Sequence, residues 1–272
     1  MQMEPDFLIS IYEKTGHNHY RSFIGMGREM AMAISRRYKV KAEFWLIARR
    51  KQRLSGLAER LQRSGRDSRI ICGDLTEDKV YEDLSSLLKK ETPEVLMLVN
   101  ASGFGKIGDF SHMDERDLSG MVDLNCRALT RMCRICIPYI PCGYGHIINF
   151  ASAAAFCPQP WFSVYAASKS YVLSFSEALS EELSSSGITV TAVCPGPVKT
   201  EFFSIAEEKA SVPLYKRLFM ADPRRVVSLV LKDSLSGRRI SIYGFSMKAL
   251  YILSRVLPTG LILGAIRIIN GR

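Results

Sequence analysis

The sequence predicts an α/β fold, in which helices cover both faces of a doubly wound, seven-stranded parallel sheet. Short apolar runs alternate with stretches of helical periodicity along most of the chain. This alternation is typical of βαβ units, whose crossover helices bury a parallel sheet. The chain has 272 residues, of which 47% are hydrophobic and 24% charged, a composition typical of one large globular domain.

The predicted strands and helices follow one another from the amino terminus. Strands are predicted at residues 7–11, 44–48, 68–72, 94–99, 146–150, 188–193 and 239–243. Helices are predicted from 28 to about 37, from 49 to about 63, from about 115 to 138 and from 164 to 183. Right-handed crossovers then place a ligand at the carboxyl ends of the strands. We expect one domain over residues 1–245, with residues 246–272 as its apolar, basic helical extension.

The formal net charge of +10 fits either a solvated basic surface or an anionic partner, such as a cofactor, an acyl carrier or a membrane. The sequence has no basic run with interleaved aromatic residues, so we expect no nucleic acid partner.

The seven cysteines are scattered, and the acidic amino terminus lacks the apolar stretch of a secretory signal. Reduced thiols and a cytoplasmic location are therefore expected. Cys133 and Cys136 have C-x-x-C spacing, but they lie inside a predicted helix with no second pair nearby. We interpret both as small buried residues and expect no metal site.

Tyr165 and Lys169 are the first candidates for chemistry. They are four residues apart in a predicted helix, so their side chains share one face. A free tyrosine has a pKa near ~10, too high for easy proton exchange at neutral pH. A cation within about 4–6 Å favours the phenolate. We therefore expect Lys169 to lower the pKa of Tyr165, and Tyr165 to act as a general acid or base.

Glycines follow the first predicted strand, at Gly16 and then at Gly25 and Gly27 on either side of Met26. Strand, glycines and helix is the layout that binds a dinucleotide pyrophosphate, because glycines let the backbone approach the phosphates and the helix start offers N–H groups. Residues 17–24 make the first glycine interval longer than in standard fingerprints. This segment either folds over the phosphates or forms a surface bulge.

The second predicted strand ends at Ala48 and is followed by Arg49 and Arg50. An acid at this point would bind the ribose 2′-OH of NAD, whereas arginine suits the 2′-phosphate of NADP. Cations at a helix start oppose the helix dipole, so helix stability does not explain them. Arg49 is the first candidate for the 2′-phosphate and Arg50 the second.

Together these residues resemble the short-chain dehydrogenase/reductase family, over roughly residues 5–245, and the resemblance implies its Rossmann-type fold. Tyr165 and Lys169 match the Y-x-x-x-K motif of that family. Ser152 lies thirteen residues before Tyr165, as the catalytic serine of the family does. Asn125 falls where the family has an asparagine in a helix.

Three further segments extend the resemblance to the cofactor site. Residues 73–75 resemble the segment with the adenine-contacting acid, residues 100–103 resemble the N-A-G motif with Ser102 inserted or substituted, and residues 195–200 resemble the P-G segment beside the nicotinamide. The family expects G-x-x-x-G-x-G after the first strand, and five extra residues here are a departure. The resemblance assigns to the cofactor Gly16, Gly25, Met26, Gly27, Arg49, Arg50, Asp74, Leu75, Asn100, Ala101, Gly103, Tyr165, Lys169, Pro195, Gly196, Val198 and Thr200.

The resemblance implies hydride transfer between a nicotinamide and a carbonyl or carbinol carbon, with NADPH preferred over NADH. In reduction, Tyr165 would protonate the developing alkoxide, and Lys169 would hold the nicotinamide ribose. Ser152 would donate a hydrogen bond to the substrate oxygen. Asn125 would hold a water that links Lys169 to solvent. The alternative is a catalytically weakened nucleotide-binding scaffold or a membrane-associated regulator.

Aromatic residues are expected around the substrate, which favours an apolar ketone, aldehyde or alcohol of lipid, acyl or steroid type. Phe104, Phe156 and Phe202 are the chosen substrate contacts, together with Ser152. Trp161, Phe162 and Phe203 are further candidates, and about half of these aromatic residues are expected in the core or at a subunit interface. The family commonly pairs subunits through the helices that carry Asn125 and Tyr165, so a homodimer or homotetramer is expected.

The extension beyond residue 245 has two interpretations. Residues 246–257 have the pattern of an amphipathic helix, and residues 261–266 continue the apolar run. Both runs are shorter than the about 20 residues of a membrane-spanning helix. The basic residues of the extension are Lys248, Arg255, Arg267 and Arg272, and no acid follows Asp233. The extension therefore lies either peripherally on an anionic inner membrane surface or over the substrate pocket or a partner subunit.

Overall fold

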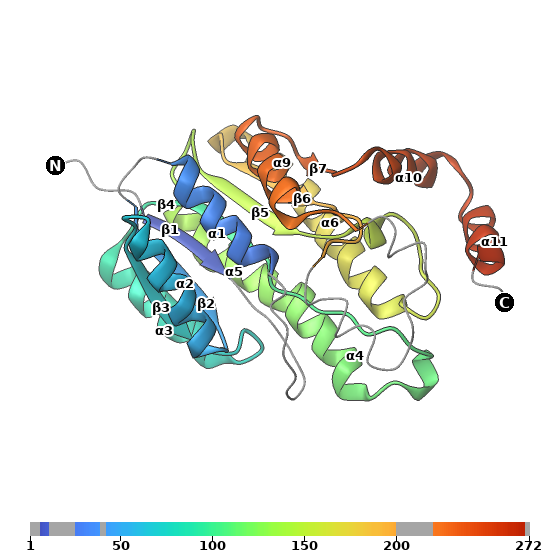
Figure 1. Cartoon of the computed structure of the whole chain (residues 1–272), viewed down its shortest axis with the longest axis horizontal. Helices are drawn as coiled ribbons and strands as arrows, with labels where there is room; N and C mark the ends of the chain where they lie inside the picture. The colour runs from blue at the N-terminus through green and yellow to red at the C-terminus, as the bar shows by residue number, and fades with distance from the viewer. Residues whose placement is uncertain (1–5, 11–24, 39–41, 200–219, 270–272) are drawn as a thin grey trace.

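A parallel sheet forms the centre of the molecule in the computed structural model, which describes residues 6–10, 25–38, 42–199 and 220–269. The strands of these residues are β1 (Asp6–Ser10), β2 (Phe44–Ala48), β3 (Ser68–Cys72), β4 (Val95–Asn100), β5 (His146–Phe150), β6 (Thr189–Val193) and β7 (Ile240–Ser241). They form one seven-stranded sheet in the order β3–β2–β1–β4–β5–β6–β7, and all neighbouring pairs are parallel (Figure 1). The predicted doubly wound sheet is confirmed.

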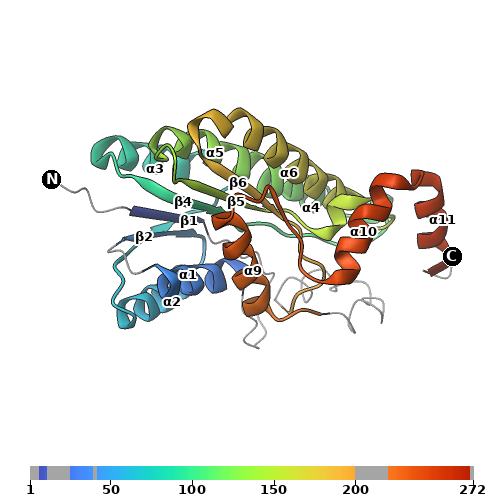
Figure 2. The ribbon, with the colours of Figure 1, turned by 90° about the horizontal axis from the view of Figure 1, so that it is seen from above.

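Helices cover both faces of the sheet (Figure 2). One face carries α1 (Met26–Arg37), α2 (Lys51–Arg63) and α9 (Pro223–Leu235). The other carries α3 (Asp78–Glu91), α4 (Glu115–Val122), α5 (Leu129–Cys136) and α6 (Ser163–Glu182). Each layer exists because its helices carry apolar side chains at helical spacing toward the sheet.

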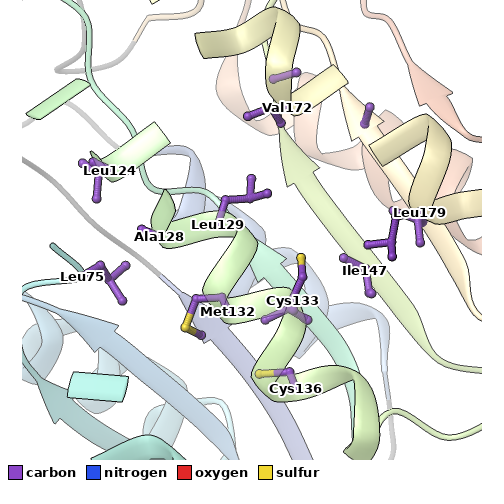
Figure 3. Packing of buried hydrophobic residues seen from close by; sticks show 14 of the residues in the cluster. Leu75, Leu124, Ala128, Leu129, Met132, Cys133, Cys136, Ile147, Val172 and Leu179 are labelled. Carbon is purple, nitrogen blue, oxygen red and sulfur yellow. The ribbon is translucent and has the colours of Figure 1, made fainter. Parts of the chain in front are cut away.

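Each face of the sheet has its own hydrophobic core. Met30, Leu54 and Val227 belong to the core beneath α1, α2 and α9. The larger core lies beneath α3, α4, α5 and α6, and Figure 3 shows part of it around α5. Cys133 and Cys136 are 1% and 0% exposed in this core, which confirms their interpretation as small buried residues.

The topology reverses direction beside β1, and this reversal positions the site. β1 pairs with β2 on one side and with β4 on the other, so successive crossovers leave β1 in opposite directions. The connections after these strands therefore diverge and leave a crevice at the carboxyl ends, where open α/β sheets bind ligands. Asn100 ends β4 at this edge, and Ser152 follows the end of β5.

The helix predicted from about 115 to 138 is not continuous. α4 ends at Val122, one turn of π-helix named η2 (Asp123–Ala128) follows, and α5 begins at Leu129. Helical periodicity cannot distinguish this insertion, because the chain continues in the same direction through it. α3 was not predicted from the sequence, and β7 is two residues long where five were predicted.

Two helices follow β7, as expected for the extension. They are α10 (Phe245–Val256) and α11 (Thr259–Ile269), and Figure 1 shows α11 beyond the end of the sheet. Within the described ranges, none of the helices is both long and apolar enough to cross a membrane. Several residues singled out from the sequence lie outside the described residues, namely Gly16, residues 17–24, Thr200, Phe202, Phe203 and Arg272.

Candidate active site

Tyr165 and Lys169 lie in the first half of α6 and are 6% and 4% exposed. The ring of Tyr165 stacks on the ring of Phe162, with centroids 4.3 Å apart. Nζ of Lys169 lies 5.8 Å from the centroid of the Tyr165 ring and donates a hydrogen bond to the carbonyl of Phe150, 2.7 Å away. The predicted helical pair is therefore present, and both side chains are fixed by neighbours.

Ser152 connects the end of β5 to this pair. Its side chain caps the short 3₁₀ helix η4 (Ala153–Phe156) and accepts a hydrogen bond from the N–H of Ala154 over 3.1 Å. The Ser152 hydroxyl also forms a hydrogen bond with Tyr165. Ser152 thus both caps η4 and contacts Tyr165, while its expected hydrogen bond to a substrate oxygen stays a prediction.

The prediction that Lys169 lowers the pKa of Tyr165 below its ordinary value is wrong for this arrangement. Burial raises the pKa of Tyr165 to about 12, and the hydrogen bond with Ser152 lowers it by less. Burial also lowers the pKa of Lys169 to about 8. The physical reason is desolvation, which disfavours both the phenolate and the ammonium in this apolar setting. Tyr165 is consequently protonated at neutral pH, as a proton donor must be.

Asn125 lies in the π-helical turn η2 and is 1% exposed. Its side-chain oxygen accepts from the N–H of Phe104 at 3.0 Å, and its nitrogen donates to the carbonyl of Phe104 at 3.0 Å. The same nitrogen donates to Oγ of Ser168 at 2.9 Å. Asn125 therefore ties the segment after β4 to α6. The amide nitrogen of Asn125 thus donates to two protein acceptors.

Two glycines let the segment after β4 approach the catalytic helix. A Cβ at Gly103 would lie 2.8 Å from Oδ1 of Asn125 and 3.0 Å from Nζ of Lys169. A Cβ at Gly105 would lie 2.5 Å from Cδ2 of Tyr165. A side chain at either position would displace a residue of the site, since real Cβ atoms do not approach so closely.

A buried polar cluster supports the site from behind. Asn100 donates to Oδ1 of Asn149 over 2.8 Å, and Asn149 donates to Oγ of Ser176 over 3.0 Å. These contacts join β4, β5 and α6 beneath the site. The predicted cofactor residue Asn100 is thus 3% exposed, and its side chain fixes neighbouring strands.

The predicted adenosine side brings together Arg49 and Asp74. Nη1 of Arg49 lies 3.2 Å from Oδ2 of Asp74. Burial alone would raise the pKa of Asp74, but hydrogen bonds from Thr76 and the charge of Arg49 outweigh it and hold that pKa below its ordinary value. The carboxylate is therefore charged at neutral pH and keeps the guanidinium at the end of β2.

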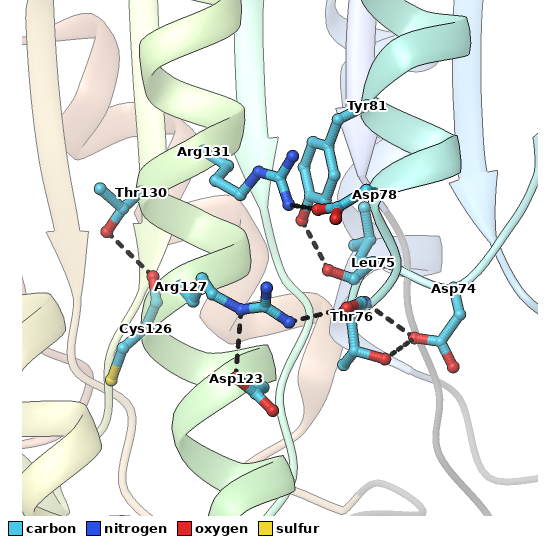
Figure 4. A network of polar contacts seen from close by, with 10 residues as sticks. All are labelled: Asp74, Leu75, Thr76, Asp78, Tyr81, Asp123, Cys126, Arg127, Thr130 and Arg131. Carbon is cyan, nitrogen blue, oxygen red and sulfur yellow. Dashed lines mark hydrogen bonds and ion pairs between the residues drawn. The ribbon is translucent and has the colours of Figure 1, made fainter.

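The turn that carries Asp74 and Leu75 is held from two helices (Figure 4). Thr76 donates to Asp74 through its N–H at 2.9 Å and its hydroxyl at 2.8 Å. Arg127 donates to the carbonyl of Thr76 at 2.7 Å, and the Tyr81 hydroxyl donates to the carbonyl of Leu75 at 2.6 Å. These contacts fix the turn that is expected to meet the adenosine.

The start of α1 fits the pyrophosphate of a dinucleotide. Gly25 has an extended backbone and precedes Met26 and Gly27, and within the described residues no side chain caps this helix start. Its first N–H groups can therefore meet an anion. Glu29, also in the first turn, would oppose an anion, but its carboxylate forms ion pairs with Arg28 at 3.6 Å and Arg224 at 3.5 Å.

The P-G segment lies beside the extension. The carbonyl of Pro195 accepts from the N–H of Ala153 at 2.9 Å, which places this segment next to Ser152. A Cβ at Gly196 would lie 2.8 Å from Sδ of Met247 in α10. Phe156 in η4 meets Tyr251 of α10 edge to face, with centroids 5.0 Å apart. α10 therefore packs on the P-G segment and on η4, beside Ser152.

The aromatic candidates fall into different positions. Phe104 and Phe162 are 1% and 8% exposed in the larger core, whereas Phe156 and Trp161 are half-buried. Trp161 has φ = 60°, a left-handed backbone that costs a bulky residue of order 1–3 kcal/mol. Sequence reasoning missed the roles of Gly105, Ser168, Met247 and Tyr251. The one sequence signal for Ser168 was its position directly before Lys169 in the Y-x-x-x-K motif.

Comparisons with known proteins point to one family. The family model described as short chain dehydrogenase matches residues 22–210. Sulfoacetaldehyde reductase 2 of Chromohalobacter salexigens is 32% identical over 203 residues, which cover 72% of this chain and 80% of that protein.

Solved structures share the whole fold. A short-chain dehydrogenase from Sphingobium yanoikuyae in complex with NADPH has a TM-score of 0.76 and 27% identity, and the match covers 95% of both chains. The bulky-bulky ketone specific alcohol dehydrogenase from Comamonas testosteroni has a TM-score of 0.71 and 25% identity, over 95% of this chain and 93% of that one.

Proposed function

The chain belongs to the short-chain dehydrogenase family and is an oxidoreductase of CH–OH groups, and from this premise we propose that it reduces an apolar ketone or aldehyde with NADPH. The observation that carries the proposal is the geometry around the buried Tyr165, which is hydrogen-bonded to Ser152 and whose ring centroid lies 5.8 Å from Nζ of Lys169. A tyrosine placed in this way can give its proton to the alkoxide that develops in reduction.

In this proposal the nicotinamide supplies the hydride, and the residues of the chain position and polarise the substrate. Ser152 donates a hydrogen bond to the carbonyl oxygen, and Tyr165 gives the same oxygen its proton. Lys169 faces the nicotinamide ribose. Asn125 is a positioning residue, because its side chain holds the segment of Phe104 against α6. The water that it was expected to hold stays a proposal.

NADPH rather than NADH is proposed because Arg49 stands at the end of β2, where the 2′-phosphate would lie. The residues that would hold the cofactor are Gly25, Met26, Gly27, Arg49, Arg50, Asp74, Leu75, Asn100, Ala101, Gly103, Tyr165, Lys169, Pro195, Gly196 and Val198. The NADPH complex of the Sphingobium relative supports this choice.

An apolar substrate is proposed from the surroundings of Ser152. Phe156 follows it in η4, Trp161 precedes α6, and Met247 and Tyr251 of α10 lie on the same side. The relative from Comamonas testosteroni, described as specific for bulky-bulky ketones, supports a large apolar ketone. Phe104 is a core residue whose main chain, held by Asn125, borders the site.

A homo-oligomer is also proposed, through the outer faces of α4 and α6. Val122 and Tyr171 are 48% and 43% exposed there, and Tyr171 stacks with Phe175 at 5.9 Å between centroids. Exposed aromatic and aliphatic side chains on neighbouring helices are typical of subunit interfaces.

The test is NADPH oxidation by the purified chain with bulky aryl ketones and 3-oxoacyl thioesters as substrates. Tyr165→Phe should bind NADPH normally but turn over at least about 10²-fold more slowly, because it loses a proton donor and little else. Tyr144→Phe, at a half-exposed tyrosine that donates a hydrogen bond to Glu94, is the matched control. Near wild-type turnover of Tyr165→Phe would overturn its assignment. Cofactor binding without turnover of any carbonyl by the wild type would favour the scaffold alternative.

A further inference from the structure

The C-terminal helices α10 and α11 leave an unusual number of apolar side chains in solvent. Of the twelve large hydrophobic side chains that are exposed in the described part of the chain, seven lie between residues 245 and 261 or at Ile268. They are Phe245, Ile252, Leu253, Val256, Leu257, Leu261 and Ile268. Exposed apolar residues that cluster in this way mark an interaction surface.

α10 has two apolar faces, and among the described residues only one of them packs on the rest of the protein. Met247 packs on Gly196 and Tyr251 on Phe156, so these side chains define the inner face. Phe245, Ile252 and Val256 are spaced by seven and four residues, which brings them onto one line of a helix turning about 100° per residue. They are 88%, 62% and 74% exposed, so this line is the outer face.

α11 continues the apolar surface away from the body of the protein. Its eleven residues include one charged residue, Arg267, and none of its described side chains is buried. Figures 1 and 2 both place it beyond the sheet and next to α10. A helix that is apolar all round is normally buried in a core or in lipid. Here the fold supplies no cover for it among the described residues.

The charge around this surface is positive. Lys248 and Arg255 border the outer face of α10, and Arg267 lies on α11; all three are exposed. No Asp or Glu follows Asp233 in the sequence. Glu177 of α6 lies 3.5 Å from Arg255. Apolar side chains edged by cations are the pattern of a helix that lies in the headgroup region of an anionic membrane.

We propose that the outer face of α10, together with α11, docks peripherally on an anionic lipid surface. A second copy of the chain fits less well, because a two-fold contact sets the same patch against itself and would bring the cations of both copies together. The helices are 12 and 11 residues long, so they suit the interface rather than a span of about 20 residues. The inner face of α10 lies on the P-G segment and η4, so docking would bring this side of the site to the lipid.

The test is co-sedimentation of the full chain with vesicles of phosphatidylcholine alone and of phosphatidylcholine with phosphatidylglycerol. The wild type should bind the anionic vesicles and lose binding as salt is added. The double variant Phe245→Ser/Val256→Ser should bind them at least about 10-fold more weakly, because two apolar side chains no longer enter the interface. Phe110→Ser removes another exposed phenylalanine, in η1 (Phe110–His112), and should bind like the wild type.

The charge variant Lys248→Glu/Arg267→Glu should discriminate lipid from protein partners. It should abolish the preference for phosphatidylglycerol while the protein stays folded and keeps its reduction of a water-soluble ketone. Absence of vesicle binding by the wild type would overturn the proposal. The proposal would also be overturned if, without lipid, the wild type sedimented as a larger species than the Phe245→Ser/Val256→Ser variant. The surface would then join two copies of the chain. Reduction of the water-soluble ketone is measured separately, so a failure of lipid docking can be distinguished from a failure of the proposed reductase function.

Discussion

The main chain of Gly105 lies against the ring of Tyr165, so closely that a Cβ at Gly105 would meet Cδ2 of that ring at 2.5 Å and Cγ at 2.8 Å. The same Cβ would lie 2.9 Å from the ring of Phe162. The two rings stack on each other and cannot both retreat. Glycine at this position therefore fixes where the tyrosine hydroxyl stands.

The first prediction concerns Gly105→Ala. The added methyl group should push Tyr165 away from Ser152 and lower turnover at least about 10-fold, because a small misplacement of a catalytic group is costly. NADPH binding should change little. Gly56→Ala, in the middle of α2 where a Cβ meets nothing within 4 Å, is the matched control and should be neutral or slightly stabilising. Equal turnover of Gly105→Ala and the control would show that the tyrosine has room to adjust.

The second prediction concerns the choice of cofactor. Arg49→Ala should weaken NADPH binding at least about 10-fold and leave NADH binding nearly unchanged, since only NADPH has the 2′-phosphate. Fluorescence titration with both nucleotides measures this. Arg63→Ala removes an exposed arginine at the far end of α2 and serves as the control. Equal losses for both nucleotides would mean that Arg49 acts only by fixing Asp74.

The convergence of the site was predictable from the sequence for a topological reason. Asn100 ends β4, whereas Arg49 and Ser152 follow β2 and β5, and parallel strands bring their carboxyl ends to one edge. The spacing of four residues was enough to predict that Tyr165 and Lys169 share one face of a helix. The motif positions and the sheet could therefore be predicted without coordinates.

What the sequence could not predict depends on tertiary contacts. The direction of the pKa shift of Tyr165 was predicted wrongly, because helical spacing locates Lys169 but does not reveal how completely both side chains are desolvated. The contact of Met247 with Gly196 joins segments about fifty residues apart, which no local pattern reports. The π-helical turn that holds Asn125 is invisible for a similar reason, since it preserves the helical direction.

The third prediction concerns Ser168, whose hydroxyl lies between Asn125 and the carbonyl of Tyr165 at 2.9 and 2.8 Å. Ser168→Ala should destabilise the protein by about 1–3 kcal/mol, because the buried amide of Asn125 loses an acceptor. Its effect on turnover should exceed the effect on KM, since Asn125 aligns the segment beside Tyr165 rather than the substrate. Urea denaturation and steady-state kinetics measure the two quantities. Ser170→Ala, two residues further along the same helix, is the control.

The last prediction uses the buried ammonium of Lys169, whose pKa burial lowers from 10.5 to about 8. Between these two pH values the unfolded chain holds more protons on this lysine than the folded chain does. The contribution of this lysine therefore increases the free energy of unfolding as pH rises from about 8 to 10.5. Below about pH 8 the folded chain bears the full cost of burying the charge.

Lys169→Met removes that cost and its pH dependence together. The variant should gain stability relative to the wild type at neutral pH, and this advantage should shrink by about 3 kcal/mol by pH 10.5. The lost hydrogen bond to the carbonyl of Phe150 shifts the difference by an amount that does not depend on pH. Burial raises the pKa of the thiols of Cys133 and Cys194 to about 12, and the charge of Lys169 lowers that of Cys194 in the wild type. Both thiols stay protonated in the folded chain up to pH 10.5 with or without Lys169, so their contribution to the difference nearly cancels. Urea denaturation of both proteins across this range measures the difference. A difference that stays constant with pH would show that Lys169 keeps an ordinary pKa in the folded chain and that its ammonium is solvated.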